Sequence, residues 1–175
     1  RYVVVGIGIN VNAREFPEEI RDKATSLKLE LGRSVKRSEV IQAVAEEFSH
    51  LKKEEVLVLM GHGTTHYANS IYAALDYTFK DKGYENIFLG TVEAYPTMES
   101  LLRMVKAYEP SKVVLAPFMI VAGDHAKNDM AGDDPESWYS QFKAAGYEVE
   151  PVVKGLGEYS GIRKLLVEHL QVLEA

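Results

Sequence analysis

The 175-residue sequence contains no cysteine and only one tryptophan. The lack of cysteine excludes disulfide bonds, zinc sites built on thiolates, a cysteine nucleophile and cysteine-ligated iron–sulfur clusters. Any metal site must therefore use histidine, aspartate, glutamate or backbone oxygen, and the sequence offers five histidines. Hydrophobic residues make up 46% of the chain and charged residues 26%, which is typical of an ordinary globular domain with one core.

Positive charge and long apolar runs are also scarce. The chain has 20 Lys and Arg against 26 Asp and Glu, and its net charge of −6 disfavours nucleic-acid binding, which needs a basic face. The longest apolar runs, such as Val113 to Ala122, are far shorter than the roughly 20 residues that cross a bilayer. No cationic start precedes an apolar signal-peptide core. We therefore expect a cytoplasmic protein that acts on a small molecule, with no nucleic acid and no membrane as partner.

Short apolar runs alternate with helical patterns over most of the chain, which indicates an α/β fold: a parallel sheet with helices on both faces. Apolar residues at helical spacing predict helices that begin near Tyr67, Met98, Trp138 and Ile162. The sheet is expected to have five strands, at residues 2–9, 56–60, 87–91, 112–117 and 147–152.

The first 50 residues follow a different pattern. One strand, at residues 2–9, is followed by two helical segments in succession, at about 17–31 and 38–52. A polar stretch at residues 49–55 marks the change to regular alternation of strands and helices. We therefore expect two segments: residues 1–50, packed onto the same domain, and an α/β domain formed by residues 54–175.

Three of the expected strands lead into loops that carry a metal-binding side chain. His62 follows one strand directly, Glu93 follows the next, and His125 stands in the long loop after the third. Because the carboxyl ends of parallel strands meet at one edge of a sheet, we expect these side chains to lie close together. Two imidazoles and one carboxylate suit a divalent ion such as Co(II), Fe(II), Ni(II) or Zn(II) and leave coordination positions open for a substrate.

Each histidine also has a plainer interpretation, because a histidine in such a loop often caps a helix or donates a hydrogen bond. His66 stands four residues after His62, but the intervening Gly-Thr-Thr lacks the glutamate of a zinc-protease helix, so we expect it to begin the following helix. His50 lies in the polar stretch and His169 in the last amphipathic helix. Both are expected to be structural or surface residues outside the site.

Two further motifs have simple structural interpretations. The run from Gly6 to Val11 begins like a dinucleotide-binding fingerprint, but it lacks the third glycine and no helix follows at once, so we expect no nucleotide cofactor. The acidic run Asp133–Glu136 is interpreted as the N-terminal cap of a helix. The apolar residues Met119–Val121 fit either the core or one wall of a cleft for a flat ligand, with the core as the favoured interpretation.

Residues from about 54 to 173 resemble the carboxyl-terminal half of the anaerobic sirohydrochlorin cobaltochelatases, class II chelatases of cobalamin biosynthesis. The resemblance implies a flavodoxin-like chelatase half and a lyase that inserts metal without a nucleotide. It also implies that His62, Glu93 and His125 bind a divalent metal, cobalt or alternatively iron or nickel, and face a sirohydrochlorin-like tetrapyrrole. The carboxylates of such a macrocycle make Lys127, together with Arg103, a candidate binding group, the alternative being a solvated surface charge. The matching runs are Leu59–Thr64, Gly90–Pro96, Pro117–Gly132 and Lys154–Glu158.

Residues 1 to about 50 are similar to the carboxyl-terminal part of a biotin protein ligase catalytic domain, through Val3–Asn12 and Ala24–Leu27. The Gly-Arg-rich adenylate loop and the Lys-Trp-Pro-Asn segment of that family do not occur in this sequence, and neither does the first half of the bilobal chelatase. Together the two resemblances imply a chimera.

Three functions remain as alternatives. The first is a chelatase-derived metal and tetrapyrrole site, whose activity is lost with half of the cleft or restored by a homodimer, as in short chelatases of the same superfamily. The second is an engineered chimeric fold with no enzymatic activity. The third, and the least supported, is a biotin protein ligase fragment.

Overall fold

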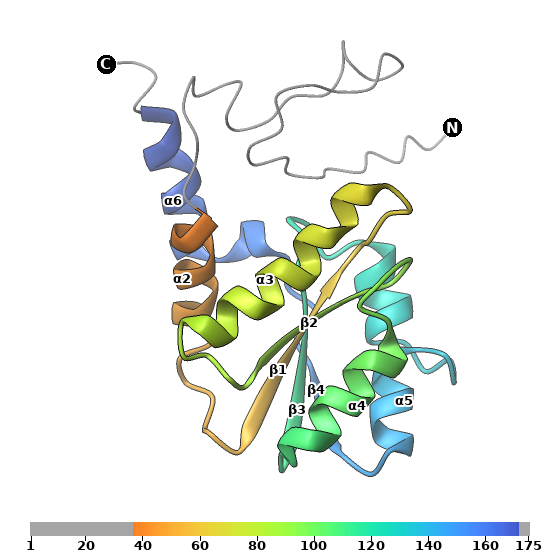
Figure 1. Cartoon of the computed structure of the whole chain (residues 1–175). Coiled ribbons are helices and arrows are strands. Elements are labelled where there is room, and N and C mark those ends of the chain that lie inside the picture. Colours follow the sequence, from red (N-terminus) through yellow and green to blue (C-terminus); the bar gives the residue numbers. More distant parts are fainter. Residues whose placement is uncertain (1–36, 172–175) are drawn as a thin grey trace, which may run out of the picture.

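The computed structural model describes residues 37–171. Its centre is a four-stranded sheet in the order β2-β1-β3-β4, with helices on both faces (Figure 1). All neighbouring strands are parallel, and Leu59 of the central strand pairs with Leu89 on one side and Ala116 on the other. The strands are β1 (Glu55–Gly61), β2 (Ile87–Thr91), β3 (Lys112–Pro117) and β4 (Glu148–Pro151).

The helices begin close to the predicted positions. Thr97 and Ser137 cap α4 and α5, because their side-chain oxygens accept hydrogen bonds from the backbone N–H of Ser100 and Ser140. The acidic run before Ser137 therefore precedes the cap and does not form it. The helices are α2 (Arg37–Glu47), α3 (Ser70–Asp81), α4 (Met98–Tyr108), α5 (Trp138–Ala144) and α6 (Ser160–Gln171), with short turns η1 (Tyr67–Asn69), η2 (His125–Met130) and η3 (Leu156–Glu158).

Two hydrophobic cores lie on opposite faces of the sheet, because successive side chains of a strand point to opposite sides. On β1, Leu57 and Leu59 enter one core, while Val58 and Met60 enter the other. The first core is closed by α2, α3 and α6, and the second by α4, α5 and η2. Figure 1 shows α2 and α6 side by side, and contacts between them join the two ends of the described chain.

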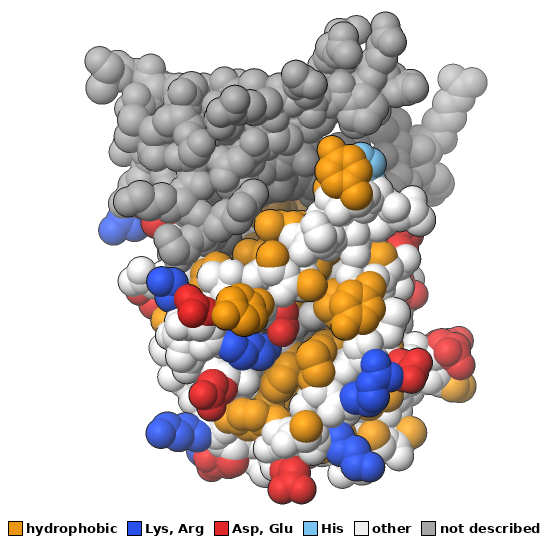
Figure 2. Space-filling view, viewed as in Figure 1, with side chains coloured by type: hydrophobic (Ala, Val, Ile, Leu, Met, Phe, Trp, Pro, Cys, Tyr) orange, Lys and Arg blue, Asp and Glu red, His pale blue; other side chains and the backbone are white. Residues whose placement is uncertain are grey.

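The surface over α3 and α4 mixes charged and apolar side chains (Figure 2). Two tyrosines in this region are strongly exposed, Tyr67 at 86% and Tyr77 at 72%. Among the described helices, none has both the length and the apolar composition needed to cross a membrane.

The structure differs from the sequence prediction in several places. The described residues contain four strands rather than five, because the expected strand 2–9 lies outside them, as does the expected helix 17–31. The helix expected at 38–52 ends at Glu47, and residues 48–50 form a turn. The packing of residues 1–50 as a distinct segment remains a prediction. Within the described residues, Ile41 and Val44 of α2 and Phe48 of the turn after it belong to the first core.

Candidate metal centre

His62, Glu93 and His125 come together at the carboxyl end of the three adjacent strands β2, β1 and β3. One potential ligand atom from each residue lies within 4.8 Å of those of the other two. The imidazole rings of His62 and His125 are nearly perpendicular, with centroids 4.7 Å apart, and Nδ1 of His62 lies 3.8 Å from a carboxylate oxygen of Glu93. The structure therefore brings together the three side chains that the sequence places at strand ends.

Two glycines fix the position of His62 at the end of β1. A Cβ on Gly61 would lie 2.3 Å from the ring of Tyr72, so the chain can pass this ring only without a side chain. Gly63 has a φ of +86°, and a Cβ there would lie 2.9 Å from the Cβ of Thr91. Nδ1 of His62 donates to the carbonyl oxygen of Gly63 at 2.9 Å, which leaves the Nε2 lone pair free to bind a metal ion.

Backbone and side-chain hydrogen bonds join the loop after β1 to the loop after β2. The backbone N–H of Glu93 donates to the carbonyl oxygen of His62 at 3.0 Å. Asn69 accepts from the backbone N–H of Thr64 at 3.0 Å and donates to the carbonyl oxygen of Tyr95 at 2.5 Å. The sequence did not indicate this role, because an asparagine near a helix start gives no signal for such a bridge.

His125 is the first residue of η2, a π-helical turn where the sequence predicted a loop. The buried side chains of Ala126 and Met130 anchor this turn in the second core. Nδ1 of His125 donates to a carboxylate oxygen of Asp129 at 2.5 Å. As at His62, the second ring nitrogen is left free to bind a metal ion.

The other histidines agree with the plainer predictions where the structure describes them. Nδ1 of His66 accepts from the backbone N–H of Ala68 at 3.2 Å, so His66 caps η1 as expected. His50 is an exposed residue in the turn after α2. His169 lies in α6, and its side chain is outside the described set.

The two basic candidates differ in their surroundings. Lys127 is exposed on η2, two residues after His125. Arg103 forms an ion pair with Glu99 at 2.6 Å and donates to Ser100 Oγ at 3.1 Å, so its charge is already engaged on α4. Both side chains are exposed, but Arg103 already has a carboxylate partner, so Lys127 is the better candidate for binding a substrate carboxylate.

The loops that carry Glu93 and His125 also expose apolar side chains. Val121 is 59% exposed and Tyr95 is 60% exposed. The favoured interpretation of residues 119–121 as core is therefore wrong for Val121, whereas Met119 and Ile120 are half-buried and pack against the two cores. The reason is that β3 ends at Pro117, so the apolar run continues past the end of the sheet, where an apolar side chain is no longer buried by the strand pattern.

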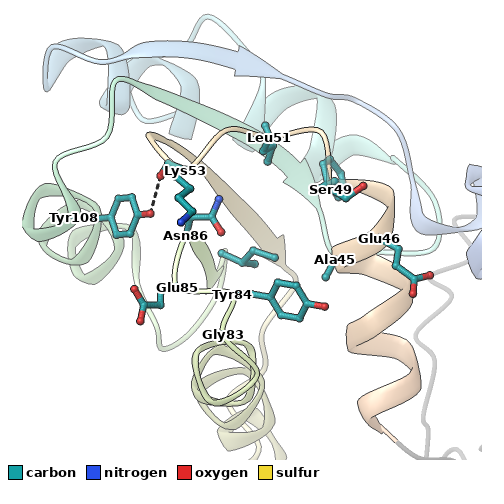
Figure 3. Close-up of a pocket in the computed structure, with 12 residues that line it drawn as sticks. Ala45, Glu46, Ser49, Leu51, Lys53, Gly83, Tyr84, Glu85, Asn86 and Tyr108 are labelled. Carbon is teal, nitrogen blue, oxygen red and sulfur yellow. Dashed lines mark hydrogen bonds between the residues drawn. The ribbon is translucent and has the colours of Figure 1, made fainter.

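A hollow of about 440 Å³ lies near the opposite, amino-terminal end of the strands (Figure 3). Two of its polar side chains are engaged in holding the fold. Tyr108 Oη donates to the carbonyl oxygen of Lys53 at 2.7 Å, and the amide of Asn86 donates to the carbonyl oxygen of Glu55 at 3.0 Å. In an open parallel sheet, ligands bind at the carboxyl ends of the strands, so the histidines, and not this hollow, are the candidate site.

The fold and the three convergent side chains define a class of protein, an open α/β domain with metal-capable ligands at the carboxyl edge of a parallel sheet. The sequence profile of the cobalt chelatase (CbiK) family matches residues 33–174. The chain belongs to this family. The match begins well before residue 54, where the motifs alone placed the start of the resemblance.

Two curated relatives are cobaltochelatases. The sirohydrochlorin cobaltochelatase of Salmonella typhimurium is 40% identical over 132 residues, which cover 75% of this chain and 50% of that protein. The sirohydrochlorin cobaltochelatase CbiKC of Nitratidesulfovibrio vulgaris is 38% identical over 119 residues, which cover 68% of this chain and 42% of that protein. The matches thus span about half the length of these relatives.

A different protein matches a shorter part of the chain. The bifunctional ligase/repressor BirA of Bacillus subtilis is 40% identical over 67 residues, which cover 37% of this chain and 19% of that protein. This match agrees with the resemblance to biotin protein ligases but covers too little of either protein to define a function.

Proposed function

We propose that this chain binds a divalent metal ion at His62, Glu93 and His125 and takes part in its insertion into a sirohydrochlorin-like tetrapyrrole, with cobalt as the metal substrate. The observation that carries the proposal is the convergence of the three ligand atoms within 4.8 Å at the carboxyl edge of the sheet. Membership of the cobalt chelatase family supports the choice of metal and substrate.

The donor set suits a metal that must be released. Two imidazoles and one carboxylate hold a divalent ion such as Co(II) and leave positions for the ring nitrogens of a macrocycle. The side chains of His62, Glu93 and His125 are 49%, 52% and 35% exposed, so a large ligand can reach them. Insertion replaces two pyrrole protons with one metal ion, and a histidine freed from the metal accepts at least one of them. No step needs a nucleotide.

Lys127 is proposed to bind a carboxylate of the macrocycle. It is exposed and stands two residues after a proposed ligand, on a chain whose net charge of −6 repels an acidic substrate. Because the metal site is open to solvent, a second protein surface is needed to enclose a flat ligand. We propose that a second copy of this chain supplies this surface, as a homodimer, when no other protein does.

A chimeric fold without enzymatic activity is the second candidate, and the match to BirA is the observation that favours it. The two candidates differ in one result, since the chelatase accelerates cobalt insertion into sirohydrochlorin and the inactive fold does not. A biotin protein ligase fragment is the weakest alternative. Formation of biotinyl-AMP by the chain would support it.

Titration with Co(II) tests the proposed site. We expect the His62→Ala, His125→Ala double variant to lose most of the affinity of the unmodified chain. The matched control is His50→Ala, which removes an exposed histidine outside the site and is expected to leave binding unchanged. Equal affinity of the double variant and the unmodified chain would overturn the proposal.

A further inference from the structure

We propose that Asp129 is a positioning residue for the metal site, which acts by holding the imidazole of His125. This inference rests on the proposed function, because it assigns a role relative to the bound metal ion. Nδ1 of His125 and Oδ2 of Asp129 lie 2.5 Å apart, and both residues belong to the same short turn, η2.

The hydrogen bond determines which ring nitrogen of His125 keeps a lone pair that can bind a metal ion. An ionised carboxylate can only accept hydrogen bonds, so Nδ1 of His125 must carry the proton. The lone pair is then on Nε2, which becomes the ligand atom. A second hydrogen-bonding partner that fixes the tautomer and the ring orientation is a regular feature of metal-binding histidines.

The turn that carries the pair is itself held in place. Ala126 and Met130 are fully buried in the second core, one residue after each member of the pair. The turn ends close to Gly132, where a Cβ would lie 2.4 Å from the carbonyl oxygen of Asn128, so the chain passes closely over its own backbone. Both side chains therefore project from a fixed backbone, and π-helical turns are often found at functional sites.

The two histidines are supported in different ways. His62 donates to the neutral carbonyl oxygen of Gly63 at 2.9 Å, whereas His125 donates to a carboxylate. A charged acceptor forms the stronger hydrogen bond and increases the electron density on the imidazole. His125 is therefore the stronger metal donor of the two, and Asp129 is the cause.

Asp129 acts through His125 and does not bind the metal directly. Within the described part of the chain, the group of side chains able to hold a metal ion consists of His62, Glu93 and His125 and does not include Asp129. If Asp129 bound the metal directly, its removal would weaken Co(II) binding whether or not His125 is present. If Asp129 positions His125, its removal weakens Co(II) binding only when the imidazole is there. This difference can be measured.

The first test measures the tautomer in the metal-free, ¹⁵N-labelled full chain at pH 8, with the imidazole signals of His125 assigned by comparison with His125→Ala. We expect the Nδ1–H form in the unmodified chain and in Asp129→Asn, which keeps an acceptor oxygen of similar shape. Asp129→Ala is expected to shift to the Nε2–H form. An unchanged tautomer in a folded Asp129→Ala protein would overturn the proposal.

The second test measures Co(II) affinity. Asp129→Ala is expected to weaken binding by about 10- to 100-fold, and Asp129→Asn by less, because the acceptor remains. Asp124→Asn removes an exposed carboxylate next to His125 that makes no capping hydrogen bond, and it is expected to change affinity less than twofold. In the His125→Ala background, Asp129→Ala is expected to have little further effect.

An equal loss of affinity in both backgrounds would contradict positioning. If the unmodified chain binds no Co(II), the proposed function fails, and the tautomer of the metal-free protein still decides whether Asp129 orients His125. Circular dichroism of each variant identifies any loss of affinity that comes from unfolding. If the alanine variant does not fold, the first test still has a result that overturns the proposal. That result is the Nε2–H form of His125 in the unmodified chain and in Asp129→Asn, which has nearly the same shape.

Discussion

The backbone N–H of Glu93 donates to the carbonyl oxygen of His62 at 3.0 Å. Two of the three proposed metal ligands are therefore tied through their backbones, independently of any metal ion. The hydrogen bond extends the pairing of β1 with β2 by one step beyond the strands, because Gly61 is the register partner of Thr91. A site built in this way is held near its binding geometry before the ion arrives, which lowers the cost of ordering the ligands on binding.

Gly63→Ala is expected to destabilise the protein and to weaken Co(II) binding. Alanine at a φ of +86° costs about 1–2 kcal/mol, and the added Cβ would lie 2.9 Å from Thr91, which brings the expected loss of unfolding free energy to about 2–4 kcal/mol. Chemical denaturation measures the loss. Gly83→Ala is the matched control, since Gly83 has the same φ but a Cβ added there would meet no atom within 4 Å, and it should lose only about 1–2 kcal/mol.

Asn69→Ala is expected to weaken Co(II) binding more than it lowers stability. The side chain joins the loop after β1 to the loop after β2 through Thr64 and Tyr95, and both hydrogen bonds are lost together. Each such bond contributes about 0.5–1.5 kcal/mol to folding. Isothermal titration with Co(II) and thermal unfolding measure the two effects, and an unchanged affinity would show that the bridge does not position the ligands.

The sequence predicted the metal-capable triad because its signal is local. Apolar runs locate the strand ends, and parallel topology requires that His62, Glu93 and His125 meet there. The supporting residues Asn69 and Asp129 could not be predicted in the same way. Their roles depend on contacts across loops and on the π-helical turn η2, for which the sequence shows no distinct period. The exposure of Val121 was missed because an apolar run alone does not show whether the residues that follow a strand are covered.

Asp76→Ala is expected to lower the free energy of unfolding by about 2–4 kcal/mol. Asp76 Oδ1 accepts from Lys80 Nζ at 2.7 Å and from the backbone N–H of Leu89 at 2.8 Å, so its loss leaves a half-buried ammonium and a strand N–H without this acceptor. Burial already lowers the pKa of Lys80. Glu99→Ala, which removes an exposed ion pair with Arg103, is the control and should cost less than about 1 kcal/mol.

Tyr159→Phe is expected to stabilise the fold by about 1 kcal/mol. The hydroxyl of Tyr159 is buried, and none of the described residues offers it a hydrogen-bond partner. The ring keeps its packing against Phe48, with centroids 5.7 Å apart, after the substitution. Urea denaturation at neutral pH measures the difference, and a less stable variant would show that the hydroxyl has a partner.

The gain from Tyr159→Phe should increase in alkaline solution. Burial raises the pKa of the Tyr159 phenol, and the carboxylates of Glu47 and Glu158 act in the same direction. The unfolded chain therefore releases this proton at lower pH than the folded chain, so the unmodified protein loses stability as the pH rises above about 10, whereas Tyr159→Phe has no such loss. Unfolding free energies of both proteins between about pH 9 and 11 test the sign, and parallel curves would contradict it.

X-ray absorption of the Co(II)-loaded chain tests the central claim most directly, because it reports the ligand atoms themselves. We expect the scattering pattern of two imidazole rings with oxygen ligands around the cobalt, and the loss of the imidazole pattern in the His62→Ala, His125→Ala variant. A cobalt ion surrounded only by oxygen in the unmodified chain would contradict the proposed metal centre.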